Sequence, residues 1–137
     1  MKNLYTIILF LLCVNMFSQK LSSDAKIKEV YATYYEEIFS NDKQLLINLN
    51  NLLENRIQYI KESEFNNLYK DSKAKIVLLS TVPLFNKFNK DLSRDKIFNK
   101  ETFNPLKYNL KFYSQSLVAY KIDDTEWLLI IHPQKQN

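Results

Sequence analysis

Lysine and phenylalanine side chains alternate irregularly between Phe85 and Tyr113, and this segment carries the clearest chemical pattern in the sequence. It has seven basic residues against three acidic ones, whereas the whole 137-residue chain has a net charge of only +4. The basic residues are Lys87, Lys90, Arg94, Lys96, Lys100, Lys107 and Lys111. Cations interleaved with exposed aromatic rings suit single-stranded nucleic acid, an anionic glycan or an acidic protein surface. We therefore treat these seven side chains as candidate partner-binding residues.

A simpler interpretation of the same segment is a long connection between elements. The dipeptide Phe-Asn occurs four times, at Phe85-Asn86, Phe88-Asn89, Phe98-Asn99 and Phe103-Asn104. Phenylalanines can pin such a connection to the core, and asparagines tolerate left-handed backbone in a chain that has no glycine. This structural interpretation is the default, and the binding surface is the sharper alternative.

The absence of glycine excludes several kinds of catalytic and nucleotide-binding motif. The phosphate-binding loop, the dinucleotide fingerprint and the esterase nucleophile elbow all require it. The chain also has one histidine and one cysteine, so that a zinc site would depend on His132 and carboxylates. Asp123, Asp124 and Glu126 fit a hairpin turn better than a calcium loop, which needs alternating oxygen ligands and a glycine. We predict no cofactor and no dedicated metal site.

His132 is the one obvious candidate for a general base. It follows an apolar run and precedes Pro133, a setting in which a partly buried histidine bonded to a neighbour is commoner than a catalytic one. Tyr31, Tyr34 and Tyr35 have helical spacing, so that core packing is their default role. An enzyme is therefore the less favoured interpretation. A deep cavity that holds His132 beside a carboxylate would favour it.

The N-terminus has the pattern of an export signal. Lys2 precedes an apolar run over residues 4–14, and Ser18 is a small residue at a suitable cleavage point. The run is shorter than the ~20 apolar residues of a spanning helix, so that membrane contact through this segment would be transient. We expect residues 1–18 to be a cleaved signal peptide and residues 19–137 to be a single small globular domain, periplasmic or extracellular.

Export also limits the classes of partner that the protein could bind. It argues against a routine nucleic-acid role, and the excess of lysine over arginine argues against base-specific recognition, which favours arginine's planar fork. An acidic protein or glycan in the envelope or outside the cell is the better candidate. The preference for Lys, Asn and Ile resembles the composition of exported proteins from bacteria with AT-rich genomes, and this resemblance implies no function.

Two amphipathic helices are predicted in the N-terminal half. The first begins near Ser22 or Ser23 and ends near Ser40, and its apolar residues recur at intervals of three and four. The second begins at Asn41-Asp42 and extends to Ile60, with Ile47 alone projecting away from its apolar stripe. The short joint between them favours an antiparallel hairpin. A capping serine, Ser63, precedes one or two further helical turns.

The C-terminal third has the alternation of strands. Residues 108–112, 118–122 and 127–131 are predicted as three antiparallel strands, with residues 123–125 as the last turn. The third is apolar on both faces and so is expected at the centre of the sheet, with a buried strand at residues 76–79 as its candidate neighbour. The predicted fold class is α+β, with an N-terminal helical hairpin packed on a small antiparallel sheet formed mainly by the C-terminal third.

Together these features predict an exported, non-enzymatic interaction or binding module whose basic aromatic segment contacts an acidic protein or glycan. The alternative is a ligand-binding or hydrolytic domain with an aromatic-lined pocket that includes Trp127.

Overall fold

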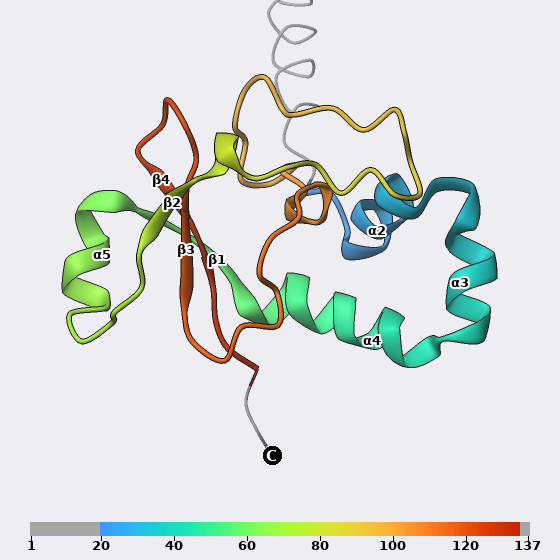
Figure 1. Ribbon diagram of the computed structural model, residues 1–137, viewed down its shortest axis with the longest axis horizontal. Helices are drawn as coiled ribbons and strands as arrows, with labels where there is room; N and C mark the ends of the chain where they lie inside the picture. The colour runs from blue at the N-terminus through green and yellow to red at the C-terminus, as the bar shows by residue number, and fades with distance from the viewer. Residues whose placement is uncertain (1–19, 135–137) are drawn as a thin grey trace, which may run out of the picture.

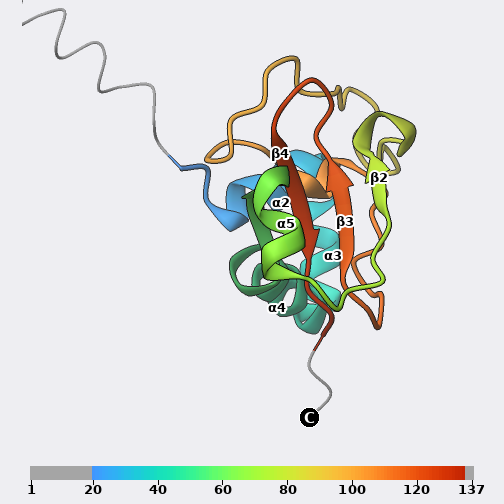
Figure 2. The ribbon, with the colours of Figure 1, turned by 90° about the vertical axis from the view of Figure 1, so that its left-hand side faces the viewer.

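The computed structural model describes residues 20–134, and the predicted signal peptide lies outside them. The fold is α+β, as predicted: a four-stranded sheet is covered by helices on both faces (Figures 1 and 2). Helix α5 covers one face, and the N-terminal helices with a long irregular connection cover the other. The strands are β1 (Ile57–Lys61), β2 (Ile76–Leu78), β3 (Val118–Lys121) and β4 (Trp127–Ile131). The main helices are α2 (Ser23–Tyr31), α3 (Tyr35–Asn41), α4 (Lys43–Asn51) and α5 (Glu62–Leu68).

Strand β4 lies at the centre of the sheet, in the order β1-β4-β3-β2. Its side chains alternate between two cores, so that Leu129 and Ile131 pack under the N-terminal helices while Leu128 and Ile130 pack under α5. All four are essentially inaccessible to solvent. The prediction of a central strand that is apolar on both faces is confirmed, because both faces of the sheet are covered.

The sheet is mixed, whereas the sequence predicted an antiparallel one. Strand β4 is antiparallel to β1 and β3, but β2 is parallel to β3. A parallel pair requires a long crossover between its strands, and residues 79–117 provide it. The prediction that β2 is buried beside β4 is also wrong, because β2 is an exposed edge strand beside β3.

The second predicted helix is too long by a whole strand. Helix α4 ends at Asn51, a π-helical turn follows over Leu52–Arg56, and the chain then pairs with β4 as β1. Ile57 and Ile60 satisfy a helical spacing in sequence, yet they face opposite sides of the sheet. Arg56 fixes the start of the strand, because its guanidinium donates to the carbonyls of His132 (3.0 Å) and Phe112 (2.6 Å).

The first predicted helix is interrupted after Tyr31. Ala32 has φ 47° and ψ −126°, and a short 3-10 turn over Ala32–Tyr34 reorients the chain before α3 begins. Positive φ favours glycine, which this chain lacks. Alanine, which has the next smallest side chain, occupies this position instead. The predicted starts of the first two helices carry caps: the Ser22 hydroxyl accepts from the Ala25 amide (3.1 Å), and the Asp42 carboxylate accepts from the Leu45 amide (2.9 Å). Ser63, predicted as the cap of the third, instead lies inside α5, which begins at Glu62.

Residues 108–112 do not form the predicted strand. They are extended but share only one antiparallel bridge, Leu84 with Tyr108, and their alternation arises because Tyr108 and Leu110 point into the core. The predicted turn at residues 123–125 is present, with Asp124 at φ 57°. Short polar residues tolerate that left-handed conformation.

The connection over residues 82–117 runs from β2 across to the N-terminal helices and back (Figure 1). Phe103 is fully buried, and Phe85, Phe88 and Phe98 pack against the same core, so that phenylalanines do anchor it. The asparagines act differently from expectation. They turn the chain through side-chain hydrogen bonds, as when Asn99 accepts from the Glu101 amide (2.9 Å), and none of the described asparagines has positive φ.

Candidate functional site

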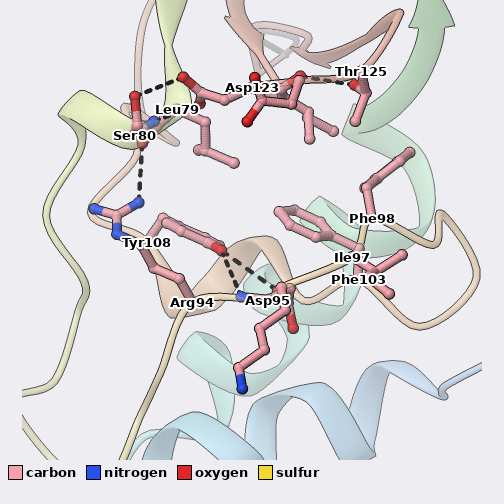
Figure 3. Close-up of a pocket in the computed structure, with 13 residues that line it drawn as sticks. Leu79, Ser80, Arg94, Asp95, Ile97, Phe98, Phe103, Tyr108, Asp123 and Thr125 are labelled. Atoms are coloured by element: carbon pink, nitrogen blue, oxygen red, sulfur yellow. Dashed lines mark hydrogen bonds between the residues drawn. The ribbon is translucent and has the colours of Figure 1, made fainter.

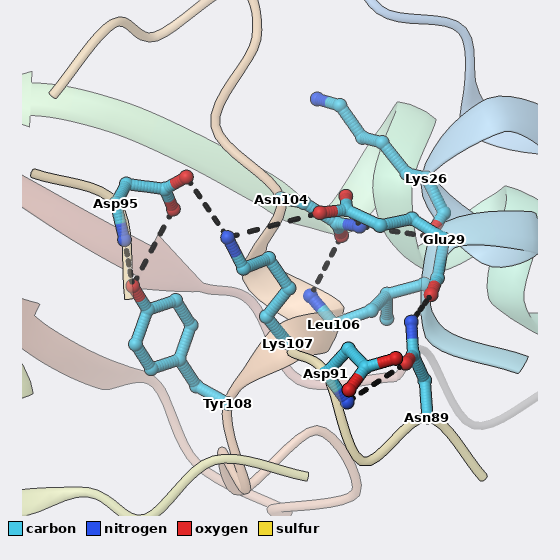
Figure 4. Close-up of polar contacts among 9 residues, drawn as sticks. All are labelled: Lys26, Glu29, Asn89, Asp91, Asp95, Asn104, Leu106, Lys107 and Tyr108. Carbon is cyan, nitrogen blue, oxygen red and sulfur yellow. Dashed lines mark hydrogen bonds and ion pairs between the residues drawn. The ribbon is translucent and has the colours of Figure 1, made fainter. Parts of the chain in front are cut away.

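The structure divides the seven predicted binding residues into two groups. Lys107 is buried and Arg94, although exposed, is bonded to backbone carbonyls, whereas the other five are exposed and form no such bonds in the described part of the chain. Lys107 is only 5% exposed, and its ammonium lies 2.9 Å from Asp95 Oδ1 and 3.7 Å from Glu29 Oε1 (Figure 4). A buried lysine with two carboxylates holds structure together and is not available to a partner.

Asn104 extends this polar cluster to helix α2. Its amide nitrogen donates to the Lys26 carbonyl and to Glu29 Oε2, both at 2.8 Å, and its oxygen accepts from the Leu106 amide (Figure 4). The side chain is 99% buried, so that these bonds replace the water it loses on folding. The cluster therefore fixes the long connection against α2.

Arg94 fixes another part of the connection. Its guanidinium donates to the carbonyls of Leu79 (3.2 Å) and Val82, and its Cζ lies 5.4 Å from the centre of the Tyr108 ring. These contacts satisfy the end of the 3-10 turn that follows β2.

Arg94 and Lys96 line a hollow of about 390 Å³, the largest of the three described here, between the β3–β4 turn and residues 94–98 (Figure 3). Two of its three acids are engaged internally: Asp123 accepts from the Ser80 hydroxyl (2.6 Å) and amide (2.7 Å), and Asp95 holds Lys107. The bonds from Ser80 keep the pKa of Asp123 below its usual value. A carboxylate so stabilised is a weak base, so that it cannot activate the serine as a nucleophile.

His132 lines none of the three hollows described here. It directly follows β4, at the end where β4 pairs with the start of β1. Its Nε2 is 3.0 Å from Gln58 Oε1 and 3.5 Å from the Tyr69 hydroxyl. Tyr69 in turn donates to Gln58 (3.0 Å). No carboxylate among residues 20–134 is bonded to His132, so that the cavity that would favour an enzyme is not formed around it.

Two further findings concern the described part of the chain. Residues 20–134 contain no group of three or more His, Cys, Asp or Glu side chains arranged to hold a metal ion. Within the same range, every helix is too short or too polar to cross a membrane.

The five exposed lysines are Lys87, Lys90, Lys96, Lys100 and Lys111, and none forms an ion pair with another described residue. They do not form one patch. Lys96 lines the hollow of about 390 Å³ and Lys100 lines a second one, while Lys87 lies over Phe88 and Lys111 is next in sequence to residues that line a third.

The third hollow, of about 240 Å³, is apolar and is walled by aromatic rings. We call it the aromatic hollow; it is lined by Val30, Tyr31, Leu49, Phe85, Leu106, Tyr108, Asn109, Leu110, Phe112 and Tyr113. Tyr31 stacks on Phe88 at a centroid distance of 4.9 Å, and Lys87 Nζ lies 5.0 Å from the centre of the Phe88 ring. Lys111 stands between two lining residues in sequence, with its backbone amide bonded to the Tyr120 hydroxyl (3.0 Å).

Backbone hydrogen bonds fix the walls of the aromatic hollow. The Phe85 amide donates to the Lys107 carbonyl (2.7 Å), and the Asn109 amide donates to the Pro83 carbonyl (2.9 Å). Burial raises the pKa of the Tyr31 phenol, which stays neutral at physiological pH. The site is thus a preformed apolar recess, and Lys87 lies over the Phe88 ring that stacks on its wall residue Tyr31.

Sequence reasoning offered an aromatic-lined pocket only as an alternative and included Trp127 in it, whereas Trp127 does not line the aromatic hollow. That reasoning assigned Tyr31 to core packing, which is confirmed, but Tyr31 also forms a wall of the recess, and Tyr34 is about half exposed. Tyr113, which also lines the aromatic hollow, is 63% exposed and is therefore not part of the core. The one signal for this hollow in the sequence was that an aromatic residue, Phe85 or Tyr113, stands at each end of the basic segment.

Comparison of the chain with models of protein families, with curated proteins and with solved structures finds no match. Inference about function therefore depends on the geometry alone.

Proposed function

We propose that this protein is an exported, non-enzymatic interaction module that binds an acidic protein segment at the aromatic hollow. The observation that carries the proposal is the preformed apolar recess, one of whose lining rings, Tyr31, stacks on Phe88 beneath the Lys87 ammonium. Lys111, next in sequence to the lining residues Leu110 and Phe112, is a second exposed lysine, and neither lysine has an ion pair in the described part of the chain. Interfaces commonly place aromatic anchors at the centre and charged groups at the rim.

The size of the recess favours one apolar side chain as its occupant. Its volume of about 240 Å³ lies below the ~300 to 1,000 Å³ typical of small-molecule sites. A sugar ring is commonly recognised on a flat exposed aromatic face, whereas this recess has apolar walls on several sides. An acidic peptide or protein surface that presents a leucine or an aromatic residue suits both the recess and the lysines.

Charge would act mainly on the rate of encounter. Exposed lysines steer an acidic partner toward the surface, and the effect weakens as salt shortens the Debye length from ~10 Å at 0.1 M to ~3 Å at 1 M. The recess would then provide the slow dissociation, because desolvated anchors determine the lifetime of a complex.

Location completes the proposal. The pattern of Lys2, the apolar run over residues 4–14 and Ser18 supports export, so that the partner would be in the periplasm or outside the cell.

The test is capture of partners from the native cell envelope with two matched triple variants. In the first, Lys87, Lys90 and Lys111 are replaced by glutamate; in the control, the exposed Lys43, Lys73 and Lys75 are replaced by glutamate. Both variants change the net charge equally. We expect an acidic protein to be captured by the wild type and the control but lost with the first variant. Capture that survives protease and is abolished by glycosidase would instead identify a glycan and overturn the choice of a protein partner.

A further inference from the structure

Three lysines line a second hollow. Its volume is about 310 Å³, and it shares no lining residue with the aromatic hollow. The lysines are Lys20, Lys26 and Lys100, and we call the site the lysine hollow. The start of β1, Glu54 and Glu101 form much of the remaining wall.

Lys26 is the unusual member of this group. It is only 8% exposed, yet its ammonium has no hydrogen bond or ion pair with any other residue in the range 20–134. Its side chain extends away from the contacts of Glu29 with Lys107, and only its backbone carbonyl joins that cluster (Figure 4). Lys107, which is similarly buried, has two carboxylates.

Most of the Lys26 side chain is buried, although its ammonium is open to the hollow. Partial removal of an ammonium from water penalises its charged form, and lysines that are buried in proteins are almost always paired. Desolvation is the main cause that lowers the pKa of Lys26, and the positive charge of Lys20 lowers it further, while Glu101 and Glu29 oppose the shift. An anion in the hollow would remove this penalty.

The glutamates of the wall do not supply that anion directly. Glu54 accepts a hydrogen bond from the Ser23 hydroxyl (3.2 Å), which directs one of its oxygens to the first turn of α2. Lys26 itself belongs to that turn, where the helix dipole also favours a negative charge. Lys20 and Lys100 line the same hollow, and no described carboxylate is bonded to the Lys26 ammonium.

We infer that the lysine hollow is a binding site for a small anionic group, a carboxylate or a sulfate, with the Lys26 ammonium as its central contact. Lys20 and Lys100 flank the group. A lysine ammonium is a compact charge without the planar fork of arginine, so that the site accepts planar and tetrahedral anions alike. The anion can be free in solution or can be carried by a larger molecule such as a sulfated glycan or an acidic peptide.

The test is a titration of the purified protein, followed by NMR of the lysine side chains and of the backbone amides. Sodium sulfate and sodium acetate are added separately in the millimolar range, with total ionic strength kept constant by sodium chloride. We expect saturable shifts that are largest at Lys26, Lys100 and the start of β1. Lys26→Met should weaken binding at least about tenfold, which corresponds to about 1.4 kcal/mol. Lys75→Met is the control, because Lys75 is exposed and does not line the hollow.

The stability of the Lys26→Met variant gives a second readout. Methionine replaces a buried charge by an apolar chain of similar length, so that without added anions the variant should be at least as stable as the wild type. A lower stability would show that Lys26 is paired within the protein, and would overturn the inference. Shifts that do not saturate, or that persist in the variant, would overturn it as well.

Two further ligands separate the sources of the anion. Tighter binding of a sulfated disaccharide than of free sulfate would identify a glycan-borne group, and tighter binding of an aspartate-rich peptide than of acetate would identify a peptide carboxylate. Equal affinities would identify the free ion. The aromatic hollow has different lining residues, so that a negative result at one hollow does not contradict the proposal for the other.

Discussion

Lys107 and Asp95 form an ion pair of 2.9 Å, Nζ to Oδ1, within the long connection between β2 and β3. The two residues are twelve positions apart, and Glu29 of α2 approaches the same ammonium from the other side. A lysine that belongs to a basic segment in the sequence is thus the residue that joins this segment to the N-terminal helices. The connection is thereby held in place although it has almost no regular secondary structure.

Replacement of Lys107 by methionine should destabilise the protein. The change removes a charge-assisted hydrogen bond, which is worth about 1.5 to 3 kcal/mol, and leaves Asp95 and Glu29 without their cation. Both acids are about one-third exposed, so that water will partly replace the lysine and the loss should be near the lower value. Urea denaturation measures it.

Lys111→Met is the matched control for that experiment. Lys111 is exposed and unpaired in the described part of the chain, and such substitutions usually change stability by less than ~0.5 kcal/mol. Similar losses for both variants would show that the ion pair of Lys107 contributes little.

The helical stripe of α4 can be tested with two aliphatic residues only two positions apart. Leu49 is buried in the main core, whereas Ile47 is 59% exposed. We expect Leu49→Ala to lower the free energy of unfolding by about 2 to 5 kcal/mol, because it leaves a cavity in the core. Ile47→Ala should cost less than ~0.5 kcal/mol. Comparable losses in a denaturant titration would contradict the orientation of the helix.

These elements also show what could be read from the sequence. Local periodicity, which depends on neighbouring residues alone, predicts which face of α4 is buried with Leu49. It also predicts that β4 is buried on both faces. The same reasoning failed at Ile57 and Ile60, because a spacing of three residues fits a helix whether or not a strand partner exists. Pairing with β4, some seventy residues later, decides the conformation, and local patterns contain no information about it.

The candidate sites depend even more on such distant contacts. The sequence identified seven basic residues, but only tertiary structure separates the buried Lys107 from the exposed Lys111. Lys26 has no distinguishing signal in the sequence, and its burial results from the packing of residues 100–105 and the start of β1 around it. Neither hollow has a sequence motif, because each is assembled from four or more separate segments of chain.

The contact of Ser80 with Asp123 predicts a pH-dependent difference in stability. Hydrogen bonds from Ser80 lower the pKa of Asp123 below its ordinary 3.8, so that the folded state favours the ionised acid. The resulting stabilisation is present above the unfolded pKa and is lost as pH falls through the lower folded pKa. Ser80→Ala should therefore be less stable than the wild type at pH 7, and the difference should shrink below pH ~3.8.

Urea titrations of both proteins between neutral and acid pH measure this difference. A matched variant is Ser116→Ala, since the Ser116 hydroxyl is not bonded to a carboxylate in the described part of the chain. A gap between Ser80→Ala and the wild type that stayed constant down to pH ~2 would show that the hydroxyl acts independently of the charge of Asp123.

Export can be tested in the N-terminal apolar run. Leu9→Arg places a charge in its middle and opposes insertion by ~2.5 to 3.5 kcal/mol, so that the uncleaved chain should accumulate inside the cell. Leu9→Ile, which keeps the run apolar, is the control. Fractionation followed by mass spectrometry of the N-terminus reports both outcomes. Recovery of a protein that starts near Gln19 from the arginine variant would refute the signal assignment.

Tyr113 provides the sharpest test of the aromatic hollow, because it is 63% exposed and forms part of its wall. Tyr113→Ala should change stability by less than ~0.5 kcal/mol, as is usual for exposed positions. Binding of the captured partner should weaken by about 2 kcal/mol or more, the loss typical of a central tyrosine in an interface. Calorimetry measures both quantities.

Leu68→Ala is the control for Tyr113, because Leu68 has a similar exposure of 57% and lies on α5, across the sheet from the hollow. It should leave the affinity unchanged. The charge variant at Lys87, Lys90 and Lys111 should chiefly slow association, whereas Tyr113→Ala should chiefly speed dissociation, since rim charges steer the encounter and buried anchors hold the complex. If Tyr113→Ala leaves the dissociation rate unchanged while the charge variant still slows association, the lysines bind the partner without the recess, and the contact is a charged surface alone.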